Sequence, residues 1–143
     1  MSEEQPPRFS VEVTAAARDI DELGHVNNAV YVGWIQKVAT AHWYATAPEG
    51  VADRNIWVVI RHEIDYRAPT LEGETVTLST WVGAAKGARF DRHVEIHGTD
   101  GMLRVKAHSW WAMLDRQTMR PLRIGSDIIE HFSHGDTSAS TDA

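Results

Sequence analysis

One long helical stretch, residues 29–44, constrains the fold of this chain more than any other feature. Apolar residues cover most of its circumference, and its polar positions fall in one narrow stripe, made of Gly33, Gln36, Lys37 and Thr40. The preceding pair Asn27-Asn28 supplies amide side chains of the kind that cap helix N-termini. Because a helix that is apolar nearly all round must be covered on most sides, the rest of the chain is expected to wrap around it.

Alternation of apolar and polar residues predicts the strands that supply this cover. The alternating positions are Phe9, Val11, Val13 and Ala15; Val58, Ile60, Ile64 and Tyr66; Val76, Leu78, Thr80 and Val82; Phe90, Val94 and Ile96; and Leu103, Val105, Ala107, Trp111 and Met113. Glycine-containing turns at 71–74, 83–87 and 98–101 separate the last four strands, and the first and third also contain acidic residues. A short helix is expected at about 126–132.

This order of elements predicts an α+β fold with one antiparallel sheet of about five strands wrapped around a long central helix. A chain of 143 residues fits a single domain. We expect that domain to cover residues 8–132. The polar segments 1–7 and 133–143 lack periodicity, so we expect flexible tails there.

Composition disfavours several classes of function. The formal net charge of −6 argues against a surface for nucleic acid. The absence of cysteine removes disulfides, thiolate metal ligands and cysteine nucleophiles. No apolar run approaches the roughly 20 residues that cross a bilayer, and residues 1–7 are acidic where a signal peptide is basic. We therefore expect a cytoplasmic protein that binds neither nucleic acid nor membrane.

The eight histidines do not by themselves predict a metal site. His93 and His97 are four positions apart, which on a strand separates them by roughly 13 Å, too far for one ion. His62 interrupts an apolar stripe, which is typical of a hydrogen-bonded histidine in a core or pocket. We expect neither a metal nor a cofactor.

The segment Asp21 to Asn28 places a carboxylate, an imidazole and two amides directly ahead of the central helix. A helix N-terminus presents unpaired N–H groups and partial positive charge, which stabilise an oxyanion that forms on a carbonyl held there. Asp21 can then take a proton from an attacking water or attack the carbonyl itself. The alternative is local: Asp21 begins an Asx turn, His25 satisfies a backbone group, and an asparagine caps the helix.

Residues 21–34, DELGHVNNAVYVGW, resemble the signature of the 4-hydroxybenzoyl-CoA thioesterase family and the D-x-N-x-H-V-N-N motif of plant acyl-ACP thioesterases, both of which have the hotdog fold. The resemblance extends through 62–69, 72–74 and 116–121. It implies an acyl-CoA thioesterase with Asp21 as nucleophile or general base and a polarising helix N–H near Asn28. The plant motif has Asn where this chain has Leu23, and His25 is assigned to orienting the loop or the substrate.

Further candidates for substrate contacts follow partly from the residue pattern and partly from the same resemblance. They are Asn27, Tyr31, Trp34, His62, Glu63, Lys86, Arg89 and Arg92. Similar proteins place basic residues on the CoA phosphates, which arginine and lysine both bind. Arg92 shares the parity of Phe90 and Val94, so it has an inward-facing alternative. Glu63 is a candidate second carboxylate.

Three functions remain in competition. The first is hydrolysis of an acyl-CoA or acyl carrier protein thioester. The second is hydration of an enoyl-CoA, but this chain lacks the G-D-x-N-P-x-H spacing that resembles hotdog hydratases. The third is a non-catalytic acyl-CoA binding module. The resemblance also implies a homodimer or a dimer-of-dimers tetramer, and an apolar helix wider than one sheet face needs such a second cover.

Overall fold

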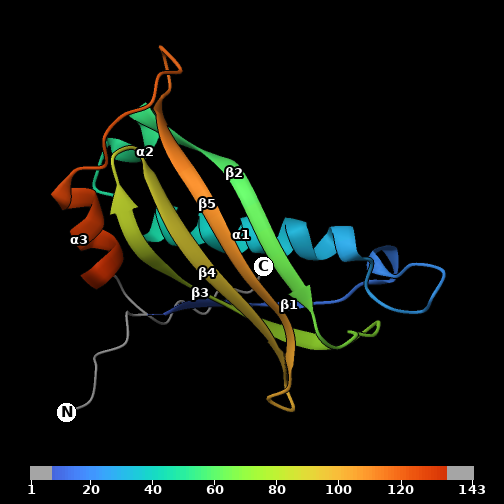
Figure 1. The fold of residues 1–143 in the computed structure, drawn as a ribbon. Helices are drawn as coiled ribbons and strands as arrows, with labels where there is room; N and C mark the ends of the chain where they lie inside the picture. Colours follow the sequence, from blue (N-terminus) through green and yellow to red (C-terminus); the bar gives the residue numbers. More distant parts are fainter. Residues whose placement is uncertain (1–7, 135–143) are drawn as a thin grey trace.

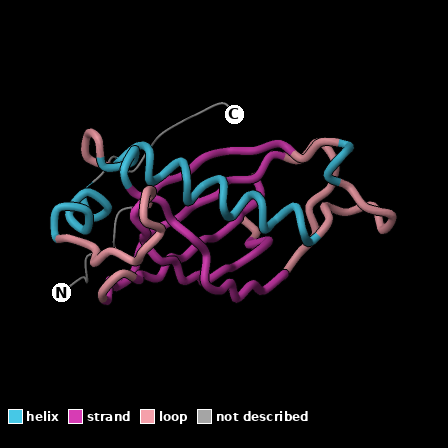
Figure 2. The backbone as a smooth tube through the Cα atoms, turned by 90° about the horizontal axis from the view of Figure 1, so that it is seen from above, coloured by secondary structure: helices cyan, strands magenta, loops and turns pink. Residues whose placement is uncertain are grey.

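The computed structural model describes residues 8–134, and residues 1–7 and 135–143, where tails were expected, lie outside the described part. The elements in chain order are β1 (Phe9–Thr14), a 3₁₀ turn (Ala17–Asp19), α1 (Asn28–Thr46), α2 (Val51–Arg54), β2 (Asn55–Tyr66), β3 (Thr75–Lys86), β4 (Arg89–Gly98), β5 (Leu103–Asp115) and α3 (Ser126–His134). The five strands form one antiparallel sheet in the order β1-β3-β4-β5-β2. The sheet curves around α1, as Figures 1 and 2 show. The α+β architecture expected from the sequence is confirmed.

Helix α1 begins at the expected capping residues. The side chain of Asn27 accepts a hydrogen bond from the backbone N–H of Ala29 at 2.8 Å, and Asn28 is the first helical residue. The predicted polar stripe of Gly33, Gln36, Lys37 and Thr40 is exposed. The buried residues of α1 are Tyr31, Trp34, Ile35, Val38, Ala39, His42, Trp43 and Thr46. The wide apolar surface of the helix is therefore covered by the sheet and by α3.

Strand β2 departs from the predicted alternation. Val59 pairs with Trp111 and Arg61 pairs with Trp110, so Ile60 is an extra residue in a β-bulge. A bulge reverses which residues face the core, because side chains alternate with a period of two. The expectation that Val58 and Ile60 share the core face with Ile64 is wrong: Trp57 and Val59 pack against the core instead, and Ile60 is 47% exposed.

Two apolar clusters divide the interior along α1. The first surrounds its N-terminal and middle turns and includes Tyr31, Ile35 and Val38. The second surrounds Ala39 and Trp43 and includes residues of α3 and of the ends of β4 and β5. The sequence predicted the helix at 126–132 that closes this second cluster, although α3 runs two residues further and α2 was not predicted. No helix in residues 8–134 is both long and apolar enough to cross a membrane.

Candidate active site at the start of the central helix

Asp21 lies in a tight loop whose ends are joined by a bridge between Ile20 and Val26. Within the loop, Asp21 N–H donates to the carbonyl of His25 at 2.9 Å. The Asp21 oxygen Oδ1 accepts the N–H of Leu23 at 2.9 Å, which is the Asx turn of the local alternative. No other interaction of the Asp21 side chain is seen within residues 8–134, so Oδ2 remains available. The turn positions the carboxylate and leaves one oxygen for chemistry.

The first turn of α1 leaves one backbone donor unpaired. Ala29 N–H binds the side chain of Asn27, and Val30 N–H binds the Asn27 carbonyl at 2.9 Å. In the described part of the chain, Asn28 N–H meets no acceptor. Asn27 therefore acts as a cap, and the free donor sits at Asn28, the position that the resemblance indicated.

A shallow surface pocket of about 240 Å³ opens beside this donor. It is lined by His25, Val26, Asn28, Tyr31, Tyr66, Arg67, Ala68 and Pro69. Tyr66 donates to the carbonyl of Asn28 at 3.4 Å, and Tyr31 donates to Thr70 Oγ1 at 3.0 Å. The structure thus brings together His25, Asn28 and Tyr31.

Two of the other candidates lie outside this pocket. Asp21 does not line it but is held next to His25 by the backbone hydrogen bond. Trp34 is buried and faces a different hollow, together with Glu12 and Lys37.

His62 and Glu63 lie on opposite faces of β2, as alternation predicts. His62 Nδ1 is hydrogen-bonded to Ser109 Oγ, while its Nε2 is buried without a partner among the described residues. Burial lowers the pKa of His62. Glu63 is exposed and forms an ion pair with Arg61 at 2.6 Å. Within one chain, therefore, the inward group of this pair is His62.

Lys86 and Arg89 lie far from Asp21 in the same chain. They face each other across the β3–β4 hairpin, whose turn contains Gly87 at a φ of 63°. This hairpin contacts the segment before α3, because Ile124 N–H donates to the Gly87 carbonyl at 2.8 Å. The two candidate phosphate ligands are thus at the C-terminal end of α1, and Asp21 is at its N-terminal end (Figure 1).

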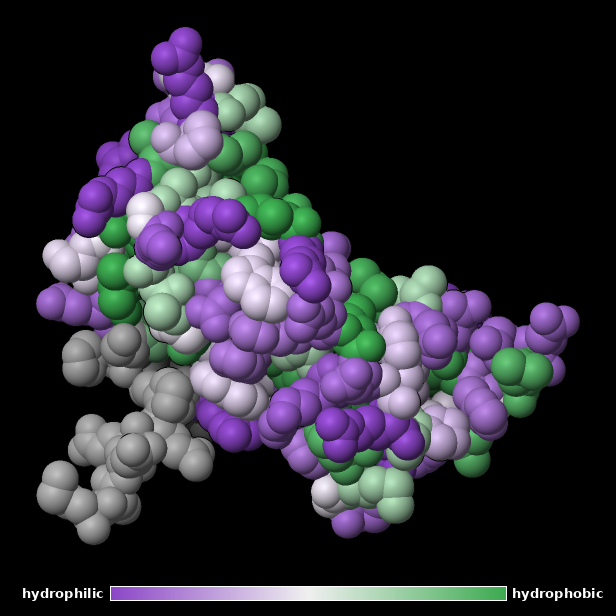
Figure 3. Space-filling model, in the orientation of Figure 1, coloured by the Kyte–Doolittle hydropathy of each residue, from purple (hydrophilic) through white to green (hydrophobic). Residues whose placement is uncertain are grey.

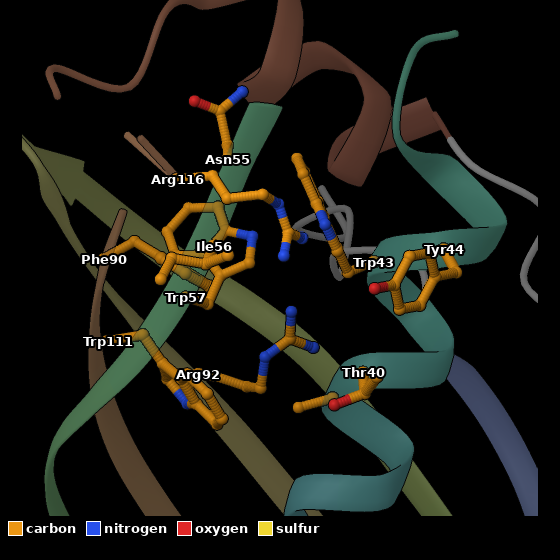
Figure 4. Close-up of a pocket in the computed structure, with 11 residues that line it drawn as sticks. Thr40, Trp43, Tyr44, Asn55, Ile56, Trp57, Phe90, Arg92, Trp111 and Arg116 are labelled. Carbon is orange, nitrogen blue, oxygen red and sulfur yellow. The ribbon is translucent and has the colours of Figure 1, made fainter. Parts of the chain in front are cut away.

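Arg92 takes its inward alternative and reaches a second cavity, which we call the Arg92 cavity. This cavity measures about 220 Å³ and lies between the C-terminal half of α1 and the sheet (Figure 4). Its aromatic wall is formed by Trp43, Trp57, Phe90 and Trp111. The guanidinium Nη1 is hydrogen-bonded to His42 Nδ1 at 3.0 Å and to Thr80 Oγ1 at 2.9 Å.

Burial shifts both basic groups of this cluster. It lowers the pKa of Arg92 to about 9, so the guanidinium remains protonated at neutral pH. Burial and, secondarily, the charge of Arg92 lower the pKa of His42 to about 3. His42 is therefore a neutral acceptor for a charged donor. His42 is not part of the local motif that precedes the helix, although its place on the covered side of α1 was a usable signal.

One group in the described residues has the spacing to hold a metal ion. Asp91, His93 and His108 lie on the outer face of the sheet with their ligand atoms within 4.8 Å of one another. Asp91 Oδ2 lies 2.8 Å from His108 Nε2. Burial alone raises the pKa of Asp91, but hydrogen bonds from His108 and from Ala84 N–H produce a net lowering. The two histidines are distant in sequence and meet only through the pairing of β4 with β5, so a local motif does not contain this group.

Comparison with known proteins identifies relatives over nearly the whole chain. Rv2001 of Mycobacterium tuberculosis, an uncharacterized protein, is 25% identical over 123 residues, which cover 82% of this chain and 46% of that protein. The chain thus spans about half the length of this relative. YneP of Bacillus subtilis, provisionally named an acyl-CoA thioesterase, is 24% identical over 120 residues, which cover 79% of this chain and 84% of that protein.

Solved structures share the fold. A thioesterase from Thermus thermophilus, solved with coenzyme A and Zn, aligns with a TM-score of 0.74 at 24% identity and covers 86% of this chain and 90% of its own. The curved five-stranded sheet around one helix is the hotdog fold that the resemblance implied. The family model described as the acyl-ACP thioesterase N-terminal domain matches residues 8–132. The chain therefore belongs to the acyl-ACP thioesterase N-terminal domain family.

Proposed function

We propose that this protein hydrolyses acyl-CoA thioesters to a carboxylic acid and CoA, with Asp21 as the carboxylate that drives the reaction. The observation that carries the proposal is the unpaired N–H of Asn28, a residue that lines a pocket beside the Asp21 loop. A thioester carbonyl oxygen that accepts this N–H meets the positive end of the α1 dipole. The names of YneP and of the Thermus thermophilus thioesterase support the same substrate class.

The reaction balances with the groups present. In the general-base route, Asp21 takes a proton from water, and the water oxygen bonds to the thioester carbon. The oxyanion that forms accepts the Asn28 N–H. Its collapse breaks the C–S bond, and the thiolate takes the proton back from Asp21. In the nucleophilic route, Asp21 bonds to the carbonyl carbon, the CoA thiolate leaves, and water then opens the anhydride.

The remaining candidates have supporting roles in this proposal. His25 and Tyr31 line the pocket and orient the acyl carbonyl. Asn27 caps the helix by accepting the N–H of Ala29, which leaves the N–H of Asn28 free for the substrate. Lys86 and Arg89 are exposed cations suited to CoA phosphates. An acyl-CoA substrate also fits the cytoplasmic location expected from the sequence.

We further propose that the working form is a homodimer joined through β2. This strand is at the edge of the sheet, is 12 residues long and exposes Ile60 and Tyr66. Figure 3 shows hydrophobic patches interrupted by hydrophilic residues along this side of the molecule. The strand also exposes Arg61, Glu63 and Asp65, and its unpaired backbone groups can pair with another strand. Two such dimers can pair again into a tetramer.

A two-fold contact between copies of one strand runs antiparallel. It therefore places the Asn55 end of β2 from one chain beside the Tyr66 end from its partner. Tyr66 contacts Asn28 at the Asp21 end, whereas Asn55 lines the Arg92 cavity. The proposed dimer thus brings the Asp21 site of one chain next to the Arg92 cavity and the β3–β4 hairpin of its partner. Within a single chain these regions lie at opposite ends of α1.

A thiol-release assay over a panel of acyl-CoAs and acyl carrier protein thioesters tests the function. Enoyl-CoA absorbance is followed in parallel. The proposal expects thiol release, with any loss of the enoyl absorbance matched by release of thiol, because hydrolysis also removes the conjugated thioester. Loss of that absorbance without thiol release would indicate the hydratase, and tight acyl-CoA binding without either reaction would indicate the binding module. Sedimentation at the assay concentration tests the dimer.

A further inference from the structure

The Arg92 cavity holds a buried cation without a counter-charge. Arg92 is only 2% exposed, and within residues 8–134 it forms no ion pair. Its hydrogen-bond partners, His42 and Thr80, are neutral groups. A buried charge without a partner of opposite sign is strongly disfavoured in a folded protein. An anion in the cavity would therefore remove the largest electrostatic cost in this part of the structure.

Hydrogen-bond donors without acceptors gather around the same cavity. Arg92 Nε, Trp57 Nε1 and Trp111 Nε1 are all buried and have no partner among the described residues. All three side chains line the cavity. Because nearly all buried donors in native proteins are paired, three orphaned donors at one cavity indicate a missing acceptor. A carboxylate offers acceptor oxygens to several donors at once.

The residues that line the Arg92 cavity favour an anion whose remaining part is apolar. Five of the lining residues are aromatic, and none of the lining residues is acidic. Arg116 adds a second cation, and its guanidinium points toward that of Arg92 across the cavity in Figure 4. A nucleotide phosphate suits an exposed, polar site, whereas this site is aromatic and enclosed by α1 and the sheet.

From these observations we propose that the Arg92 cavity binds the distal carboxylate of an acyl group, and that the enzyme prefers dicarboxylic monothioesters over methyl-terminated acyl-CoAs. This inference rests on the proposed thioesterase function. In the proposed dimer the cavity of one chain lies beside Asp21 of its partner, so one acyl group reaches from the thioester at Asp21 to the carboxylate at Arg92. Arg92 is then a specificity residue, because it contacts the substrate but not the reacting atoms.

A binding measurement separates this inference from the function on which it rests. Trp43, Trp57 and Trp111 line the cavity, so a ligand there changes tryptophan fluorescence. Hexanedioic acid is titrated against hexanediamide, its neutral counterpart of similar size, with CoA and chloride as further probes. We expect saturable binding of the diacid with at least roughly tenfold weaker binding of the diamide, because only the carboxylate forms a desolvated charge pair with Arg92. Equal binding of the diacid and the diamide, or displacement of the diacid by CoA or chloride at similar concentration, would overturn the proposal.

The kinetic test compares kcat/KM for hexanedioyl-CoA and hexanoyl-CoA. In Arg92→Met, which keeps the bulk of the side chain without the charge, we expect the ratio of the two values to fall by roughly 30-fold or more. Arg92→Lys should recover part of it. Arg120→Met is the matched control, because Arg120 is an exposed arginine that does not line the cavity.

The outcomes remain distinguishable. Thiol release with an unchanged ratio in Arg92→Met would overturn the assignment of Arg92 and leave the thioesterase function standing. Absence of thiol release from every ester, with diacid binding still lost in Arg92→Met, would overturn the function and support the cavity as a carboxylate site. A circular dichroism melt of each variant confirms that the comparison is made on folded protein.

Discussion

The two ends of α1 are built for different tasks. The N-terminal end is open: Asn28 is exposed, its N–H is unpaired, and Asp21 is held in the hydrogen-bonded loop that precedes the helix. The C-terminal end is closed: His42 and Trp43 are buried with Arg92 behind an aromatic wall. The open end has a polar group that can react and no deep cavity for an acyl chain. The closed end has the cavity but no carboxylate to attack a thioester.

Their separation explains why one chain is not enough. About 15 residues of α1 lie between the two ends, which corresponds to roughly 22 Å along the helix axis. In an antiparallel contact between two β2 strands, the N-terminal end of α1 in one chain lies beside the C-terminal end of α1 in the partner. The comparison therefore predicts that changes at the open end affect chemistry, changes at the β2 edge affect assembly, and changes at the closed end affect stability and selectivity.

The largest expected effect is at the open end. Asp21→Asn keeps the size of the side chain and the Oδ1 acceptor for Leu23 N–H, but it removes the base. We expect thiol release to fall by roughly 10²- to 10⁴-fold, while the free energy of unfolding changes by less than about 0.5 kcal/mol. Glu22→Gln is the matched control, since Glu22 is an exposed carboxylate one position away. Near-normal turnover in Asp21→Asn would show that Asp21 does not drive the hydrolysis.

Separating the two chains should have the next largest effect. Ile60 is exposed at the bulge of β2, and lysine on an edge strand opposes pairing with another strand. We expect Ile60→Lys to sediment as a monomer and to lose at least about tenfold in turnover, although each chain keeps both ends of α1. Leu71→Lys is the control, because Leu71 is equally exposed in the loop that follows β2. Full turnover by a monomer would show that the two ends need not meet across chains.

The sequence predicted the open end and missed most of the closed end, for a physical reason. Asp21, His25 and Asn28 are close in the chain, so a local motif contains their geometry. The alternation of β4 also offered an inward-facing position for Arg92 as an alternative, and Arg92 occupies that position. However, the cavity depends on the pairing of strands distant in sequence and on the bulge that turns Trp57 inward. Neither the register nor the bulge leaves a signal in an alternation pattern.

The closed end should be revealed by the pH dependence of stability. The folded chain holds His42 at a pKa of about 3, well below the value of roughly 6.5 that applies when the chain is unfolded. As the pH falls through 6.5, the unfolded chain binds a proton that the folded chain does not. This contribution to stability is thus fully present above pH 6.5 and decreases toward pH 3.

His42→Asn isolates this contribution, because its amide oxygen can accept from Arg92 as Nδ1 does but does not titrate. We expect the wild type to lose roughly 2 to 3 kcal/mol more unfolding free energy than the variant between pH 7 and pH 4.5. Urea unfolding at each pH gives the two curves, and the other histidines cancel in their difference. Parallel curves would mean that His42 is solvated.

The smallest expected effect concerns the two cations of the β3–β4 hairpin. Lys86 and Arg89 are exposed, so each contributes little to the binding of a phosphate in water. We expect Lys86→Ala or Arg89→Ala to raise KM for acyl-CoA by roughly 1.5- to 5-fold and to leave kcat nearly constant. A contact far from the carbonyl binds the ground state and the transition state equally, which is why KM alone responds.

Added salt and a substrate without the nucleotide test whether this small effect comes from binding of the CoA phosphates. Added salt should raise the KM of the wild type toward that of the variants, since it screens exposed charges. Lys37→Ala is the control, because Lys37 is an equally exposed lysine on the polar stripe of α1, away from the hairpin. An acyl thioester of a short pantetheine without the nucleotide should be insensitive to all three substitutions. If Lys86 and Arg89 affect that ester as strongly as acyl-CoA, they act on the acyl group, and the hairpin belongs with the Arg92 cavity rather than with the phosphates.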